Sequence, residues 1–178
     1  AGVLGAPMAE LRAPEDTNSE HVTGHDDEGD EGTYLPPPEE LGRMLALARA
    51  GVVHETMADA ALLLLFTAQR RRTVVNARAA QFAEEDGVLV WKIPGRFRKT
   101  GRTKKGQAKP RSHDLPLPEE AAAMVRRRLE AKTESGWLFP GIRPRRRGDD
   151  VKQLGADSLT HLFADLPGIT MSPHDTRR

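Results

Sequence analysis

The sequence predicts a mainly helical domain with a small antiparallel β-sheet, of the α+β class. Three observations lead to this prediction: apolar stripes at helical spacing, one continuous apolar run that suits a buried helix, and only two short segments that read as strands. The chain has 178 residues, enough for one domain with a substantial core. It contains no cysteine, which excludes disulfides and thiolate zinc sites.

Residues 1–35 are predicted to be an acidic, disordered arm or linker, and residues 36–178 to form the folded domain. The arm is polar, rich in glycine and proline, and shows no apolar period. Nine acidic residues against one arginine give it a net charge of −8. His21 and His25 lie beside acidic residues, but Gly32 comes one position late for a calcium loop. We therefore expect no metal site in the arm.

Helices are predicted over most of the first half of the folded domain. Residues 36–51 carry Pro38 near their start, two glutamates behind it and a glycine stop, which indicates a helix with one apolar stripe. The seven apolar residues 60–66 predict that the next helix, 56–67, is buried on all sides. They are too few to span a bilayer. A further helix is predicted over residues 72–82.

A strand is predicted over residues 87–93, where β-branched and aromatic residues are dense, and a second strand is predicted to follow over residues 111–117. A long hairpin connects them. It carries seven cationic side chains: Arg96, Arg98, Lys99, Arg102, Lys104, Lys105 and Lys109. Such a hairpin can reach into a groove of nucleic acid or follow its backbone, although a solvated loop would show the same composition.

The C-terminal part is predicted to contain two more helices. Residues 118–132 begin with glutamates and end with cations, which matches the helix dipole and places Arg126 to Arg128 on the surface. Residues 158–166 are predicted to form a short helix whose four large apolar side chains face inward, with His161 as an ordinary surface or packing residue. Between 91 and 147, seventeen Lys and Arg oppose five acidic residues, a net charge of +12 that suits a polyanion or a basic solubilising face.

The buried helix ends directly before three consecutive arginines, Arg70, Arg71 and Arg72. An unpaired guanidinium in the interior would cost several kcal/mol, so at least one of the three must meet an anion or reach solvent. Arginine suits phosphate because its planar fork can bind two oxygens at once. The alternative is that all three cap the helix C-terminus, where cations are favoured.

Two segments resemble sequence boxes of the tyrosine recombinases, also called phage integrases. Residues 65–78, LFTAQRRRTVVNAR, resemble that family's first catalytic box, L-x-T-G-x-R-R-x-E-x-x-x-L-R. Residues 172–178, SPHDTRR, resemble its His-Asp-Leu-Arg-Arg box, and the Lys-rich hairpin lies between the two. The resemblance covers residues 35–178. It departs from the family at Ala68, Thr73 and Ala79, where Gly, Glu and Trp are usual.

The resemblance implies a role for particular residues. Arg70 and Arg177 would hold the non-bridging oxygens of the scissile phosphate, and His174 would assist proton transfer. Lys99 matches best the lysine that protonates the 5′-oxygen leaving group, with Lys104, Lys105 and Lys109 as alternatives because this hairpin is longer than usual in the family. No metal or cofactor is implied, because guanidinium groups neutralise the phosphate. The family's nucleophile is a tyrosine beyond the second box, yet the one tyrosine here is Tyr34. The DNA-contacting residues would be Arg96, Arg98, Arg102, Lys104, Lys105 and Lys109.

The function implied by the resemblance is site-specific DNA recombination or integration through a phosphotyrosine intermediate, here in a partial catalytic domain that stops before the tyrosine. The alternative is a non-catalytic DNA-binding remnant of an integrase. A single-strand nucleic-acid binder is disfavoured because the aromatic residues lie in core-like patterns. The expected partners are double-stranded DNA and, in a full-length protein, further copies of the chain on DNA, with no membrane. We expect the protein to be bacterial or phage-derived, to lie in the cytoplasm and to associate with DNA.

Overall fold

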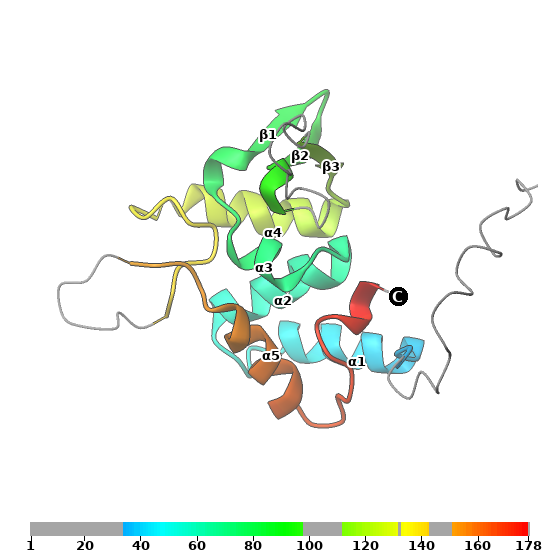
Figure 1. Cartoon of the computed structure of the whole chain (residues 1–178). Coiled ribbons are helices and arrows are strands. Elements are labelled where there is room, and N and C mark those ends of the chain that lie inside the picture. Colours follow the sequence, from blue (N-terminus) through cyan, green and yellow to red (C-terminus); the bar gives the residue numbers. More distant parts are fainter. Residues whose placement is uncertain (1–33, 98–111, 132, 143–150, 178) are drawn as a thin grey trace, which may run out of the picture. The chain divides into compact units, whose positions relative to one another are not determined.

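The computed structural model describes residues 34–97, 112–131, 133–142 and 151–177, of which residues 34 onward form one unit. The described part is mostly helical with one three-stranded antiparallel sheet, so the predicted fold class is confirmed (Figure 1). The acidic arm up to residue 33 and hairpin residues 98–111 lie outside the described residues. The elements in chain order are α1 (Pro38–Arg49), α2 (Glu55–Thr67), α3 (Arg71–Val75), β1 (Phe82–Glu85), β2 (Val88–Ile93), β3 (His113–Pro116), α4 (Glu119–Glu130) and α5 (Ala156–Asp165).

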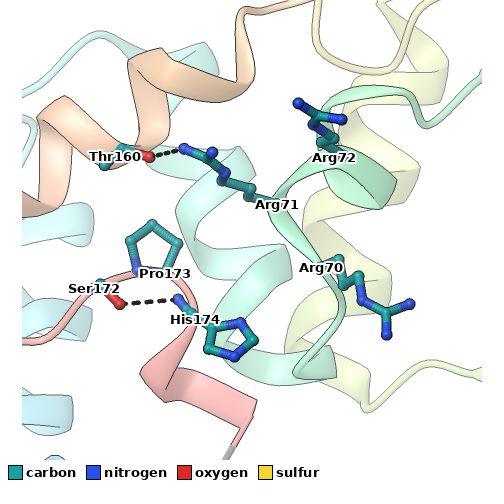
Figure 2. A pocket seen from close by; sticks show the side chains of 7 residues that line it. All are labelled: Arg70, Arg71, Arg72, Thr160, Ser172, Pro173 and His174. Atoms are coloured by element: carbon teal, nitrogen blue, oxygen red, sulfur yellow. Dashed lines mark hydrogen bonds between the residues drawn. The ribbon is translucent and has the colours of Figure 1, made fainter. Parts of the chain in front are cut away.

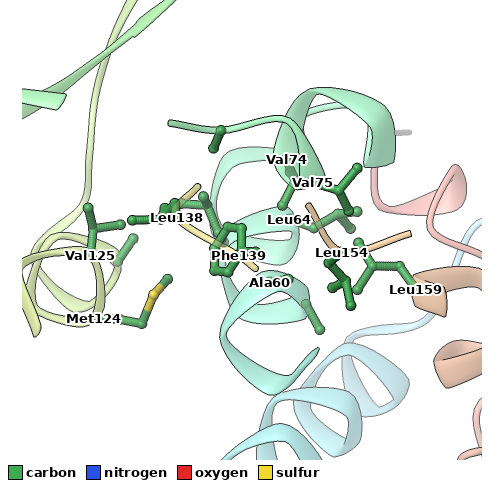
Figure 3. Close-up of a cluster of buried hydrophobic side chains, with 14 of the residues drawn as sticks. Ala60, Leu64, Val74, Val75, Met124, Val125, Leu138, Phe139, Leu154 and Leu159 are labelled. Carbon is green, nitrogen blue, oxygen red and sulfur yellow. The ribbon is translucent and has the colours of Figure 1, made fainter. Parts of the chain in front are cut away.

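Helix α2 is the centre of the domain. It packs against α1, α3, α4 and α5, and seven of its residues are buried. Figure 3 shows its Ala60 and Leu64 among side chains from α3, α4, α5 and the segment around Phe139. The prediction of a helix buried on all sides is therefore confirmed, and the reason is its nearly continuous apolar surface.

The sheet has the order β1-β2-β3, with β2 in the middle. Trp91 on β2 pairs with Phe82 on one side and Leu115 on the other. Its fully buried indole stacks on Phe82 with ring centroids 5.4 Å apart, and its N–H donates to the Gln81 side chain at 3.2 Å. Both predicted strands are thus present, and Trp91 anchors them to the core.

The helix predicted over residues 72–82 is wrong. Helix α3 ends at Val75, and Phe82 begins strand β1. The segment between them pairs with a distant part of the chain: the Leu138 amide donates to the Ala77 carbonyl at 2.9 Å, and the Ala79 amide donates to the Gly136 carbonyl at 3.1 Å. These long-range bonds prevail over the helix propensity of an alanine-rich stretch.

The prediction that Arg126 to Arg128 all lie at the surface is wrong for Arg128. Its side chain is only 10% exposed and donates to the Asp59 carboxylate at 2.6 Å. Asp59 itself lies on the buried helix α2 and is 3% exposed. Arg127 donates to the same carboxylate at 2.7 Å. A buried charge requires such a partner, and this one fastens α4 to α2.

Ala68, directly after α2, adopts the left-handed conformation, with φ 49° and ψ 29°. Glycine takes this conformation freely, whereas an L-residue pays roughly 1–2 kcal/mol. Ala68→Gly is therefore expected to raise the free energy of unfolding by about 0.5–1 kcal/mol, after allowance for the greater flexibility of glycine in the unfolded chain.

The matched control is Ala123→Gly on the exposed face of α4, which is expected to lower the free energy of unfolding by about 0.5–1 kcal/mol. Urea denaturation measures both changes. Equal destabilisation by the two substitutions would contradict the assigned role of the Ala68 conformation.

Candidate phosphate-binding site

The turn between α2 and α3 places Arg70. After the left-handed Ala68, the chain is extended at Arg70, whose carbonyl accepts the Thr73 and Val74 amides at 2.8 and 3.1 Å as α3 begins. Thr73, Val74 and Val75 are buried beneath it. The core therefore fixes the backbone on both sides of the turn, and the arginine side chains project from its edge.

The C-terminal segment brings His174 and Arg177 to the same region. The Asp175 carboxylate accepts the backbone N–H and the hydroxyl of Ser172, both at 2.7 Å, and the Ser172 hydroxyl accepts the His174 amide at 3.2 Å. The Arg177 amide then donates to the His174 carbonyl at 3.2 Å, in a short 3₁₀ turn over Asp175–Arg177. Side chains three residues apart eclipse in such a turn, so His174 and Arg177 lie on one side.

A pocket of about 420 Å³ opens between these two segments. Figure 2 shows its lining: three arginines from the turn and α3, a threonine from α5, and three residues of the C-terminal segment. They are Arg70, Arg71, Arg72, Thr160, Ser172, Pro173 and His174. Two of the residues predicted to act on a phosphate, Arg70 and His174, therefore line the same pocket although they lie far apart in the sequence.

The three arginines have different surroundings. Arg71 extends toward α5, where it donates to the Thr160 hydroxyl and pairs with Asp157 at 3.2 Å (Figure 2). Arg70 extends away from α5, and Arg72 is exposed. Within the described part of the chain, no ion pair includes Arg70 or Arg72. Arg71 is thus already satisfied by the protein, whereas Arg70 has its guanidinium open to a ligand.

Arg177 lies close enough to Arg70 for their charges to interact. Partial desolvation of its guanidinium and the positive charge of Arg70 both lower the pKa of Arg177. Arginine remains protonated in proteins, so two like charges influence each other here, and neither forms an ion pair with an acidic residue among the described residues. A bound oxyanion would relieve this repulsion, and a phosphate offers oxygens for both forks.

Most residues of the predicted cationic hairpin lie outside the described residues. These include Lys99 and the DNA-contact candidates Arg98, Arg102, Lys104, Lys105 and Lys109. Arg96 is described: it is exposed in a short 3₁₀ turn after β2, with its guanidinium carbon 5.0 Å from the centre of the Phe97 ring. Its role in DNA binding stays a prediction.

Glu40 is a buried residue near the site that the sequence analysis did not single out. Its carboxylate accepts hydrogen bonds from the Tyr34 phenol, the Thr170 amide and hydroxyl, and the Met171 amide, the last at 2.8 Å. Two adjacent glutamates after a proline are typical of any helix start, and no signal separates Glu40 from the exposed Glu39. Its partners Thr170 and Met171 lie 130 and 131 residues away in the sequence, which no local pattern reveals.

The hydrogen bonds of Glu40 make the stability of the fold depend on pH in the acidic range. Burial alone would raise the pKa of Glu40, but the bonds from Tyr34, Met171 and Thr170 outweigh it and lower the pKa from 4.5 to about 2. A carboxyl group with a lowered folded-state pKa stabilises the fold above its unfolded pKa. This contribution is therefore expected to disappear as the pH falls from 4.5 to about 2.

The variant Glu40→Gln cannot titrate, and it should lose less stability than the native chain over the same pH range. Urea denaturation at several pH values between 2 and 5.5 measures the difference. Parallel pH profiles for the two proteins would contradict the role assigned to the Glu40 carboxylate.

The described residues contain no group of three or more histidine, cysteine or acidic side chains placed to hold a metal ion. Among the described helices, none is both long and apolar enough to cross a membrane. The cationic, open character of the pocket instead points to an anionic ligand.

The fold resembles the catalytic domain of the tyrosine recombinases. The chain is similar to the crystal structure of XerA recombinase, with a TM-score of 0.56 and 16% sequence identity over 81% of this chain and 47% of that chain. It is also similar to the XerH site-specific recombinase, solved bound to difH substrate in a pre-cleavage complex, with a TM-score of 0.51 and 18% identity. That match covers 82% of this chain and 40% of XerH.

The chain thus spans less than half the length of both recombinases. At these identities the similarity establishes the fold. No protein-family model matches the sequence, and no curated protein does.

Proposed function

We propose that residues 34–178 form a DNA-phosphate-binding domain of the tyrosine-recombinase type, which acts in site-specific recombination or integration by DNA strand cleavage and rejoining. The observation that supports the proposal is that Arg70 and His174 line one pocket, while Arg177 lies close enough to Arg70 for their charges to interact. Neither guanidinium forms an ion pair with an acidic residue in the described part of the chain. The fold resemblance supports it, because XerA and XerH are recombinases.

Each residue would have a distinct role in this reaction. Arg70 and Arg177 bind the non-bridging oxygens and stabilise the charge that grows on them as the phosphorus becomes pentacoordinate. His174 assists removal of the proton from the attacking phenol. The tyrosine oxygen forms a bond to phosphorus, the bond to the 5′-oxygen breaks, and Lys99 donates a proton to that oxygen. The product is a 3′-phosphotyrosine and a free 5′-hydroxyl.

The attacking tyrosine is not supplied by Tyr34. Its phenol donates to Glu40, and this hydrogen bond is the largest cause that raises the pKa of Tyr34. In the family that the two sequence boxes resemble, the nucleophile follows the second box, whereas Tyr34 precedes the first. Strand cleavage at this site therefore requires a tyrosine outside residues 1–178, in a longer chain or from a partner molecule.

A second candidate function is DNA binding without strand cleavage. Position 73, where the recombinase box usually has glutamate, holds a buried threonine that is 3% exposed. Threonine cannot orient a neighbouring cation as a carboxylate does. Such a domain would still bind duplex DNA through Arg70, Arg177 and the cationic hairpin, and the two candidates differ only in covalent chemistry.

Duplex binding tests what both candidates share. The 178-residue chain is expected to bind a double-stranded oligonucleotide with an affinity that falls steeply as salt rises, because phosphate contacts release counterions from DNA. Fluorescence anisotropy at several salt concentrations measures this dependence. An affinity that does not change with salt, or the absence of binding at low salt, would overturn the proposal.

A further inference from the structure

A carboxylate on helix α1 binds the segment that carries His174 and Arg177. Glu40 is 6% exposed, and its carboxylate receives the amides of Thr170 and Met171 together with the Thr170 hydroxyl at 3.0 Å. The Tyr34 phenol donates to its other oxygen and accepts the Thr170 hydroxyl at 2.9 Å. We name these four residues, Tyr34, Glu40, Thr170 and Met171, the Glu40 clamp.

The clamp acts directly next to the candidate site. Met171 is followed by Ser172 and Pro173, which line the pocket, and then by His174. Ser172 is hydrogen-bonded to both His174 and Asp175, which ties this turn together. In Figure 1 the segment runs beside α1, on which Arg43 makes a second contact by donating to the Gly168 carbonyl at 3.1 Å.

We propose that Glu40 is a positioning residue, which sets the placement of His174 and Arg177 against Arg70 by fixing the backbone at Thr170 and Met171. The inference rests on the proposed function, since it assigns Glu40 a task in phosphate binding. A site whose charged groups are held in place before the ligand arrives binds more tightly than one that must be ordered by the ligand.

The chemistry of the clamp explains why a side chain of this length with two polar atoms at its end is needed at this position. One oxygen accepts three hydrogen bonds from the C-terminal segment, and the other accepts the phenol proton. Alanine at position 40 would leave the Thr170 and Met171 amides without their acceptor. Glutamine would keep the accepting oxygen, and its amide group could donate to the Tyr34 oxygen instead. Aspartate would keep the charge but fall short by one methylene.

The experiment compares the native 178-residue chain with E40A, E40Q, E40D and E39A. Glu39 is the matched control, because it is exposed, adjacent and equally charged. In the free protein, NMR measures the position of the His174 ring signal and the hydrogen exchange of the Met171 amide. E40A and E40D should shift the ring signal and speed exchange of the amide by at least about tenfold, whereas E40Q and E39A should match the native chain.

The same proteins are then titrated with a labelled DNA duplex at one low salt concentration. E40A and E40D should bind about tenfold more weakly, since two side chains must now be ordered on binding. E40Q should bind within about twofold of the native chain, because the clamp is restored without the charge. E39A should bind as the native chain does or slightly more tightly.

The NMR measurements and the DNA titration test the clamp and the proposed function separately. If the native chain binds no duplex, the proposed function fails, while the ring signal and amide exchange still decide whether Glu40 positions His174. If E40A has the same His174 ring signal and the same duplex affinity as E39A, the positioning role is overturned. If E40A does not fold, E40D and E40Q decide the question, and equal ring signals and affinities for these two variants would overturn it.

Discussion

Replacing Asp59 by alanine is expected to lower the free energy of unfolding by about 3–5 kcal/mol, the range measured when one partner of a buried ion pair is removed. The reason is the position of Arg128. Its side chain is 10% exposed, and the Asp59 carboxylate accepts its Nε–H at 2.6 Å. Without Asp59, the guanidinium would remain between α2 and α4, and its remaining ion pair within the described residues would be the longer one to Glu55 at 3.8 Å. Denaturation in urea, followed by circular dichroism, measures the loss.

Glu55→Ala is the matched control for Asp59→Ala. Glu55 contacts both Arg127 and Arg128, but its side chain is 66% exposed, so its removal is expected to cost below about 1 kcal/mol. The paired substitution of Asp59 by leucine and Arg128 by methionine should recover most of the stability, because it removes both buried charges. An Asp59→Ala variant as stable as Glu55→Ala would show that the buried ion pair does not hold α4 to α2.

The second large effect concerns covalent chemistry at the pocket. A chimera that adds the C-terminal segment of a tyrosine recombinase, with its tyrosine, after Arg178 is expected to form a covalent adduct with a nicked DNA substrate. In this chimera, Arg70→Ala or Arg177→Ala should reduce the adduct by roughly a hundredfold or more, the effect of removing one donor that stabilises a developing oxyanion. A denaturing gel separates the adduct from free protein.

Two controls accompany the adduct measurement. Arg126→Ala should change adduct formation little, because Arg126 is paired with Glu84 and Glu119 at 2.8 and 3.1 Å and does not line the pocket. The 178-residue chain itself should form no adduct, since Tyr34 is engaged with Glu40. An adduct from the 178-residue chain, or an Arg70→Ala chimera as active as its parent, would show that the site is wrongly assigned. A chimera that binds DNA but never forms an adduct would favour the non-catalytic alternative.

The parts of the fold that follow from local pattern were predictable from the sequence. The apolar run of α2 predicted a helix buried on all sides, and the β-branched residues of β2 predicted a strand. Local pattern failed where distant bonds decide the structure. Ala77 and Ala79 favour helix by propensity, yet their backbones pair with Leu138 and Gly136. Arg128 reads as a surface cation because its partner Asp59 is 69 residues away.

The candidate site was predictable mainly through its resemblance to known sequence boxes. An unpaired guanidinium is costly in the interior, so at least one of Arg70, Arg71 and Arg72 had to meet an anion or solvent. In the structure Arg71 pairs with Asp157, Arg72 is exposed, and Arg70 extends away from α5. The resemblance singled out Arg70, and the structure shows Arg71 occupied by Asp157 and Thr160. Glu40 had no signal in the sequence, because an acidic residue in a first helical turn is common whether exposed or buried.

The most direct test of the central claim, that Arg70 belongs to a DNA-phosphate site, is the salt dependence of duplex binding by the native chain, Arg70→Ala and Arg126→Ala. Each phosphate contact contributes about one unit to the slope of the logarithm of the binding constant against the logarithm of salt concentration. Arg70→Ala is expected to weaken binding and to reduce this slope by about one, while Arg126→Ala leaves both unchanged. An Arg70→Ala variant with the affinity and slope of the native chain would contradict the claim.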